Sequence, residues 1–125
     1  ESIPRTSGFS QDEMSRARHY FEVHYNEDIS IEQYAASRSM STSWFTRSFR
    51  NATGTSPMQY ILQTRIRNAQ TLLETTDDSI TNIASIVGYD NPMYFSRLFS
   101  RAKGVSPTGY RKIYREKYLE EIDKE

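Results

Sequence analysis

The sequence contains no cysteine, and this absence removes several kinds of site at once. Disulfides, thiolate metal sites and a cysteine nucleophile are all excluded. A chain without cysteine also fits a reducing compartment, so we expect a cytoplasmic protein.

Long hydrophobic runs are lacking as well. No stretch of about 18 apolar residues occurs, so neither a membrane span nor a membrane partner is expected. The chain begins at Glu1 with no charged-then-apolar leader, so the sequence does not indicate secretion. Because the first residue is not methionine, we expect the chain to be part of a longer protein.

Residues that could form a catalytic site are scarce. His19 and His24 are the only histidines, and a spacing of five places them on different faces of a helix. A metal pair on a helix requires a spacing of four, and no cluster of carboxylates completes a site. A glycine-rich phosphate loop is also missing. We therefore expect no enzyme activity, no metal and no cofactor.

Acidic residues are absent from two long windows, although the net charge of the chain is zero. The windows are residues 33–73 and 91–115. Their basic residues are Arg38, Arg47, Arg50, Arg65, Arg67, Arg97, Arg101, Lys103, Arg111, Lys112 and Arg115. A solvated surface normally mixes the two signs, so these windows favour faces that bind a polyanion.

Signals for the start of a helix recur along the chain. Ser10 is predicted to cap a helix to about Tyr25, with Glu13 closing a capping box and Phe9 packing on Met14. Ser-Pro pairs and glycines mark further starts and ends. Strand signals are lacking, so the class is all-α and homeodomain-like, with about seven helices. They cover about 10–25, 31–37, 42–53, 57–75, 80–87, 92–103 and a last helix from 107.

The helix predicted over 57–75 is longer than the helices on either side of it. Its predicted buried stripe is Met58, Leu62, Ile66, Ala69 and Leu73. The expected organisation is a linker remnant at 1–9, a first subdomain at 10–55, the linker helix at 56–75, a second subdomain at 76–115 and an acidic tail at 116–125. This tail either continues the last helix or frays.

An internal repeat is the most informative feature of the sequence. Residues 45–60 align with residues 95–110 without a gap. The identical pairs are Phe45/Phe95, Arg47/Arg97, Phe49/Phe99, Ala52/Ala102, Gly54/Gly104, Ser56/Ser106, Pro57/Pro107 and Tyr60/Tyr110. Upstream, Ser30/Ser79, Ile31/Ile80 and Ala35/Ala84 also match, with the offset reduced by one. The chain therefore contains two copies of a helix–turn–helix–turn unit.

In each copy a short helix is followed by a tight turn and a second helix, which is helix-turn-helix organisation. The second helix has one stripe that should face the core: Phe45, Phe49 and Ala52 in one copy, and Phe95, Phe99 and Ala102 in the other. The outward stripes are Ser43, Thr46, Arg47 and Arg50, and Met93, Ser96, Arg97 and Ser100. The N-terminal end of such a helix enters a DNA major groove.

Arginine can bind O6 and N7 of guanine with two hydrogen bonds, and Arg47 and Arg97 occupy equivalent positions. The candidates for base contact are Ser43, Trp44, Thr46, Arg47, Met93, Tyr94, Ser96 and Arg97. Trp44 and Tyr94 pack either on thymine methyls and sugars or on the edge of the core. The candidates for phosphate contact are Arg50, Asn91, Arg101, Lys103, Arg111 and Lys112. We expect Arg65 to make an intramolecular contact instead.

Three stretches resemble the AraC/XylS family of bacterial transcription regulators. The first comprises Ser30–Ala35, Met40–Phe49 and Gly54–Tyr60, and the second comprises Ile83-Ala84, Gly88–Phe99 and Gly104–Arg111. Between them, Arg65–Leu73 is similar to the linker-helix motif of the family. The resemblance covers about residues 10–115.

This resemblance implies sequence-specific binding of double-stranded promoter DNA, with recognition helices at 42–53 and 92–103. It also implies activation of transcription through contact with RNA polymerase, and an N-terminal sensor or receiver domain in the full-length protein. Because Met93 stands where a polar residue could contact bases, the second unit either contacts bases directly or grips the backbone and senses DNA shape.

We expect the two recognition helices to enter successive major grooves about 34 Å apart, a separation that a linker helix of about 28 Å could set. The alternative function is a protein-interaction module contacting RNA polymerase or another regulator. Salt distinguishes the two, because DNA binding weakens steeply between about 50 and 200 mM salt and an apolar interface does not.

Overall fold

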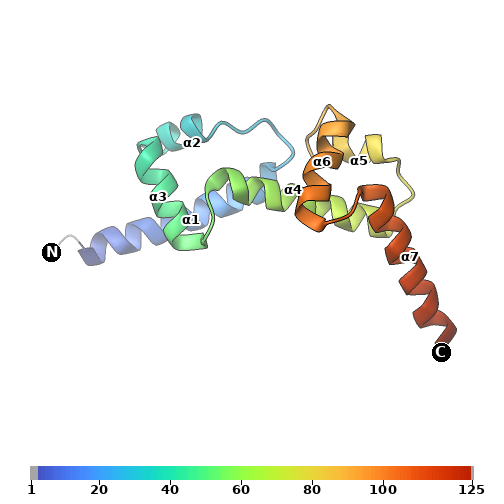
Figure 1. The fold of residues 1–125 in the computed structure, drawn as a ribbon. Coiled ribbons are helices and arrows are strands. Elements are labelled where there is room, and N and C mark those ends of the chain that lie inside the picture. The colour runs from blue at the N-terminus through green and yellow to red at the C-terminus, as the bar shows by residue number, and fades with distance from the viewer. Residues whose placement is uncertain (1–2, 125) are drawn as a thin grey trace. The chain divides into compact units, whose positions relative to one another are not determined.

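The computed structural model describes the backbone of residues 3–124 and the side chains of residues 11–118 and 121. Within this range the secondary structure consists of helices, and no strand is present (Figure 1). Their bounds are α1 Ile3–His24, α2 Ile31–Ser37, α3 Thr42–Thr53, α4 Pro57–Thr75, α5 Ile80–Ile86, α6 Pro92–Lys103 and α7 Pro107–Lys124. The predicted all-α class with seven helices is confirmed. No helix in the described range combines the length and apolar character of a membrane span.

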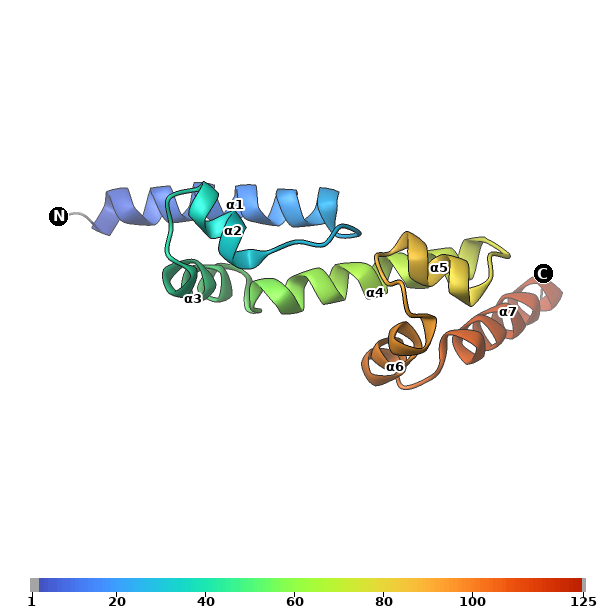
Figure 2. The ribbon, with the colours of Figure 1, turned by 90° about the horizontal axis from the view of Figure 1, so that it is seen from above.

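The chain divides into two compact units, Glu1–Thr64 and Arg65–Glu125, and the division falls within α4. The first unit contains α1, α2, α3 and the start of α4. The second contains the rest of α4 with α5, α6 and α7. In each unit the helix-turn-helix pair packs on a long helix, and α3 and α6 each run steeply across the long helix of their unit (Figures 1 and 2).

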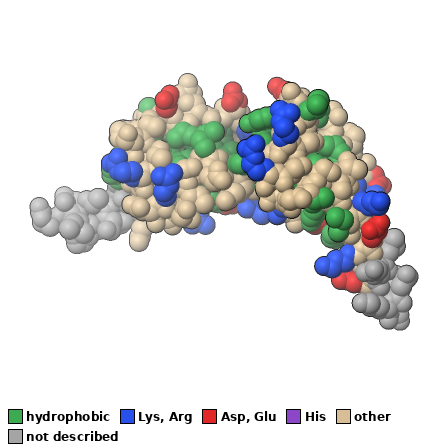
Figure 3. Space-filling view, in the orientation of Figure 1, with side chains coloured by type: hydrophobic (Ala, Val, Ile, Leu, Met, Phe, Trp, Pro, Cys, Tyr) green, Lys and Arg blue, Asp and Glu red, His purple; other side chains and the backbone are tan. Residues whose placement is uncertain are grey.

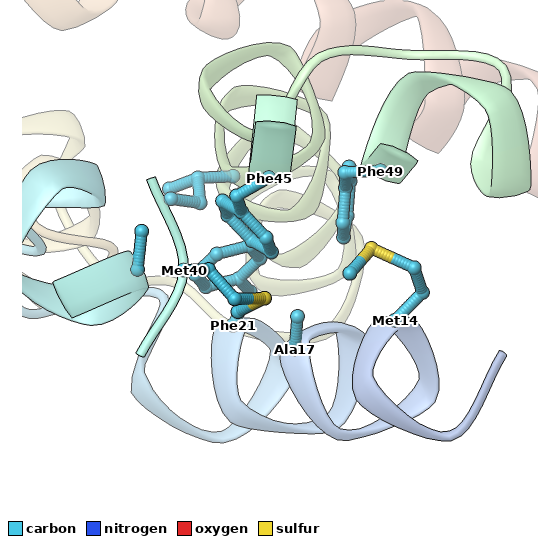
Figure 4. Packing of buried hydrophobic residues seen from close by; sticks show 8 residues of the cluster. Met14, Ala17, Phe21, Met40, Phe45 and Phe49 are labelled. Atoms are coloured by element: carbon cyan, nitrogen blue, oxygen red, sulfur yellow. The ribbon is translucent and has the colours of Figure 1, made fainter. Parts of the chain in front are cut away.

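The core of the first unit contains side chains from all of its helices, including Ala35 of α2 and Ile61 of α4, and its labelled side chains point toward one another in Figure 4. Helix α1 contributes Met14, Ala17 and Phe21, the turn before α3 contributes Met40, and α3 contributes Phe45 and Phe49. Phe21 lies with its ring centroid 5.6 Å from that of Phe49 and 6.3 Å from that of Phe45. All three rings are fully buried, so this aromatic cluster fixes the rotation of α3 against α1.

The second unit repeats this arrangement with the second half of α4 in the place of α1. The buried residues Met14, Ala17 and Phe21 of α1 have the same spacing as Ile66, Ala69 and Leu73 of α4. Phe95 and Phe99 are fully buried, as Phe45 and Phe49 are. In both copies the second helix is therefore held against the long helix by equivalent buried residues.

Polar side chains cap the starts of α2, α3, α5 and α6. The Oγ atoms of Ser30, Ser41 and Ser79 accept hydrogen bonds from the backbone N–H three residues on, at 3.0–3.1 Å. Asn91 accepts from two such groups, of Met93 and Tyr94. Each cap satisfies backbone donors that would otherwise lack a partner, so these side chains set where the helices begin.

The turns between the paired helices use left-handed backbone. Ser39 has φ 61° and Gly88 has φ 110°, and the two residues are equivalent in the repeat. The following N–H groups, of Met40 and Tyr89, both donate to the carbonyl of the equivalent alanine, Ala35 or Ala84, at 2.8 Å. The extra residue of the second copy, Asp90, therefore follows the turn, where the repeat offset changes by one.

Helix α1 begins earlier than predicted. Its backbone is helical from Ile3, so Ser10 lies within the helix rather than at its start. Extending an existing helix adds one hydrogen bond per residue, so a weak start signal inside a helix does not begin a new one. Glu13 does not close a capping box either, because its carboxylate pairs with Arg38.

Two predicted stripes are also partly wrong. Met58 is 62% exposed, and Ile61 takes its place in the core of the first unit. The reason is that α4 serves both units and buries different faces along its length, so a single stripe does not describe it. Ala52 and Ala102 are exposed in the last turns of α3 and α6, where a single methyl group costs little in water.

Candidate nucleic-acid interface

Helix α3 exposes a polar stripe on the side away from its two buried phenylalanines. Ser43, Arg47 and Arg50 are exposed, and Thr46 is half-buried. Trp44 is half-buried and packs against the core cluster of the first unit, which supports the core-edge interpretation of this residue. The stripe begins directly after the Ser41 cap, at the helix end that enters a major groove in helix-turn-helix proteins.

Helix α6 presents the equivalent stripe with different chemistry. Met93 is 70% exposed and Tyr94 is 47% exposed. Arg97 is exposed, and its Cζ atom lies 6.0 Å from the centroid of the Tyr94 ring. The Tyr94 ring also contacts Tyr89 edge-on, with centroids 5.9 Å apart. Tyr94 therefore lies between the turn and Arg97, while Ser96 is half-buried between the two faces.

Several basic residues of the acid-free windows are held inside their own unit. Arg38 donates from Nε and Nη2 to the two carboxylate oxygens of Glu13, at 3.0 and 2.9 Å. Arg65 stacks on Tyr89, with Cζ 4.8 Å from the ring centroid. The predicted intramolecular contact of Arg65 is thus confirmed, and both residues fasten the helix-turn-helix turn to the long helix of the unit.

The end of α4 is held by two arginines of α7. Arg111 donates from Nε to the carbonyl of Leu73 and from Nη2 to that of Thr76, both at 3.1 Å. Arg115 donates to the same Thr76 carbonyl and pairs with Asp77 at 2.6 Å. The last carbonyls of a helix lack partners within it, so Arg111 serves as a cap for α4. Because these N–H groups of Arg111 are bound to backbone carbonyls, they are not free to bind the phosphate predicted for this residue.

The remaining predicted cations are exposed. Figure 3 shows Lys and Arg side chains over α3 in the first unit and over α6 in the second. The exposed basic residues of the two windows are Arg47, Arg50, Arg67, Arg97, Arg101, Lys103, Lys112 and Arg115, of which Arg115 pairs with Asp77. Arg101 and Lys103 lie in the last turn of α6, where the helix dipole also favours positive charge. Asn91 has its side-chain oxygen committed to the cap of α6.

A tyrosine–glutamate hydrogen bond is also repeated in the two units, and the sequence analysis did not predict it. The hydroxyls of Tyr60 and Tyr110 donate to the carboxylates of Glu22 and Glu74, which are equivalent residues of α1 and α4. Burial, and then the bonded carboxylate, raises the pKa of Tyr110 to about 12 and raises that of Tyr60. Aligning Met14–Glu22 with Ile66–Glu74 would have revealed the pairing, because the tyrosines were already matched.

A hollow of about 580 Å³ lies between α1 and α2, where Tyr20, His24 and Tyr34 form its aromatic part. None of the residues that line it belongs to α3 or α6. His24 pairs with Glu27 at 2.7 Å at its rim. Among the described residues, no three potential metal ligands gather in one place. The repeated stripes of α3 and α6 are therefore the main candidate site.

The chain is similar to known helix-turn-helix proteins. Residues 34–113 match a family model described as a helix-turn-helix domain. The MmsAB operon regulatory protein of Pseudomonas aeruginosa is 36% identical over 97 residues, which are 78% of this chain and 32% of that protein. The chain spans about a third of the length of the curated relatives it matches.

Two solved structures have the same fold. The DNA-binding domain of AdpA, solved in complex with a target DNA, is 35% identical with a TM-score of 0.78, covering 83% of this chain and 94% of that chain. The C-terminal domain of AraT, a response regulator from Geobacillus stearothermophilus, is 35% identical with a TM-score of 0.77, covering 80% and 84%.

Two helix-turn-helix units, each with an exposed arginine on its second helix, define a DNA-binding domain of a transcription regulator. The chain belongs to the AraC/XylS family, and it contains the two helix-turn-helix units of that family. The family consists of regulators rather than enzymes.

Proposed function

We propose that this domain recognises promoter DNA by inserting the N-terminal ends of α3 and α6 into successive major grooves. Arg47 and Arg97 carry base recognition, each binding a guanine edge, and Ser43, Thr46 and Ser96 contact neighbouring base edges or phosphates. Arg50, Arg101, Lys103 and Lys112 contact phosphates and set the register on the duplex. Helix α4 acts as the linker between the two recognition units.

One observation supports this proposal above the others. Arg47 and Arg97 are equivalent in the repeat and exposed, and each lies six residues after the capping residue of its recognition helix. Buried phenylalanines on the opposite face hold both helices in the same orientation toward the solvent. An arginine required only for solubility would not need to recur at one position of two units.

In the whole protein, we propose that a sensor or receiver domain controls this domain and that DNA-bound protein contacts RNA polymerase. The length of the curated relatives and the response-regulator relative support a second domain. The site of action is then the bacterial cytoplasm, where promoter DNA is found.

The proposal is tested by selecting a duplex from a random library and measuring its binding by fluorescence anisotropy. The Arg47→Ala and Arg97→Ala variants should each lose about ten- to a hundredfold in affinity for the selected duplex. A matched control, Arg16→Ala/Lys117→Ala, removes two exposed positive charges outside the recognition helices. It should bind nearly as tightly as the wild type.

Binding of the wild type should also weaken steeply between about 50 and 200 mM salt. Equal affinity for the selected and a scrambled duplex would contradict the proposal. So would a double variant, Arg47→Ala/Arg97→Ala, that loses no more affinity than the charge-matched control.

A further inference from the structure

The two recognition helices differ most at the first position of their outward stripes. Helix α3 begins its stripe with Ser43, and the equivalent residue of α6 is Met93. Met93 is 70% exposed, the highest value among the large hydrophobic side chains that the structure describes as exposed. The second unit therefore places a thioether where the first places a hydroxyl.

The fold of the second unit does not account for Met93. Phe95 and Phe99 fill the core behind α6 and are fully buried, whereas Met93 lies on the opposite side of the helix. The cap of α6 uses only the backbone N–H of Met93, which any residue except proline could supply. The cost of exposing this side chain to water is therefore not offset by packing within the protein.

Met93 is part of a small apolar surface beside a cation. An open hollow of about 480 Å³ lies at the start of α6, lined by Met93, Pro92 and Ile80 together with Thr81, Ser96 and Arg97. Tyr94 adds a half-exposed ring that also contacts Arg97. Figure 3 shows hydrophobic side chains adjoining basic ones over α6. This surface suits a partner that offers an apolar group next to a polar acceptor.

The major groove of DNA contains one such apolar group. Each thymine projects a 5-methyl group from its edge, while guanine offers the O6 and N7 acceptors to arginine. Methionine is flexible and polarisable, so it adapts well to a single methyl group. Met93 and Arg97 are about one helical turn apart on α6, roughly 6 Å along its axis, which corresponds to about two base pairs of the duplex.

Given the proposed function, we propose that Met93 is a specificity-determining residue of the second unit and contacts a thymine methyl within about two base pairs of the guanine bound by Arg97. Ser43 gives the first unit no such preference, because a hydroxyl gains nothing from a methyl group. The two halves of the site are therefore recognised by different chemistry, although the two units share one fold.

Replacing thymine by uracil in the selected duplex removes only the methyl group and tests the inference directly. The position of each half-site is assigned first, since Arg47→Ala and Arg97→Ala should relax selection at different bases. Uracil at one thymine of the second half should lower the affinity of the wild type about fourfold, the value of one buried methyl group. Uracil in the first half should have less than a twofold effect.

Variants of Met93 complete the test. Met93→Ser should bind the thymine and uracil duplexes equally, and Met93→Leu should keep the difference. Both should unfold at the wild-type temperature, because residue 93 is exposed.

Two results would overturn the inference: wild type that binds thymine and uracil duplexes equally at every position, or a Met93→Ser variant that keeps the difference. The first result is expected if the second unit senses only DNA shape. Either result leaves the Arg47 and Arg97 measurements standing, so failure of the inference is distinguishable from failure of the proposed function.

Discussion

Glu13 of α1 and Arg38 of the helix-turn-helix turn form a two-point ion pair, with nitrogen–oxygen distances of 3.0 and 2.9 Å. Glu13 is only 7% exposed. The hydrogen bonds from Arg38 hold the pKa of the Glu13 carboxyl below its ordinary value of 4.5, against the opposing effect of burial. The pair ties the first helix-turn-helix to its supporting helix at a point where the second unit uses the stacked pair Arg65–Tyr89.

Replacing Glu13 by glutamine should lower the free energy of unfolding at neutral pH by about 1–3 kcal/mol, because a charged hydrogen-bonded pair is lost. The depressed pKa means that the carboxylate stabilises the fold fully above about pH 4.5 and loses this effect as pH falls through the lower, folded-state value. Urea unfolding of the wild type and Glu13→Gln should therefore differ at about pH 7 and converge as the pH falls below 4.5 and through the lowered pKa of Glu13. A constant difference across this range would contradict the assignment.

The positive-φ turns give a second prediction. Ser39 pays a steric cost at φ 61° that glycine would avoid, whereas Gly88 occupies φ 110°, where a side chain is strained. Ser39→Gly should change the free energy of unfolding by less than about 1 kcal/mol, in the stabilising direction. Gly88→Ser should lower it by about 1–3 kcal/mol. Chemical denaturation followed by circular dichroism measures both, and equal effects of the two changes would argue against the turn geometry.

The repeat explains how much of the fold could be predicted from the sequence. The serine caps and glycine ends act on residues within one turn, so the starts and ends of α2 to α6 followed from local patterns. The pairing of Glu13 with Arg38 spans 25 residues, and no local pattern indicates it. The spacing of Glu13 from Ser10 fits a capping box, so the local pattern predicts that motif instead.

The candidate site was predictable to a similar extent. The recurrence of Arg47 at Arg97 identified the outward stripe, because equivalent positions of a repeat face the same way. The roles of single cations were not predictable, since Arg111 and Lys112 are adjacent and both basic. Only the structure shows that Arg111 binds carbonyls of α4 while Lys112 is exposed. Similarly, α4 contributes to the cores of both units, so its sequence pattern alone does not show that Ile61 is buried and Met58 exposed.

Tyr110 gives a prediction at high pH. Its pKa is raised to about 12 by burial and by the bond to Glu74, so the neutral phenol is favoured in the folded state. This contribution is complete below the ordinary value of 10 and is lost as pH rises through about 12. Tyr110→Phe should lower the free energy of unfolding by about 1–2 kcal/mol near pH 7. The late-titrating part of the phenolate absorbance should be smaller in this variant than in the wild type, because Tyr60, whose pKa is also raised, remains.

Tyr118→Phe provides the matched control for that titration, because Tyr118 is 54% exposed on α7. Its removal should leave both the stability and the late component unchanged. A smaller late component in Tyr118→Phe, or an undiminished one in Tyr110→Phe, would show that the pKa of about 12 does not belong to Tyr110.

Arg111 and Lys112 are adjacent on α7, and their variants test which cations stabilise the fold and which, as proposed, contact DNA. Arg111→Ala removes hydrogen bonds to the carbonyls of Leu73, in the last turn of α4, and of Thr76, directly after it, so it should lower the free energy of unfolding by about 1–3 kcal/mol. Lys112→Ala removes an exposed charge and should leave the unfolding temperature unchanged.

In DNA binding, Lys112 rather than Arg111 should matter. Lys112→Ala should reduce the slope of log affinity against log salt by about 0.9, the value of one phosphate contact. Under conditions where both variants are folded, Arg111→Ala should keep the wild-type slope. A reduced slope in Arg111→Ala with unchanged stability would instead return Arg111 to the phosphate-binding set and remove its role as the cap of α4.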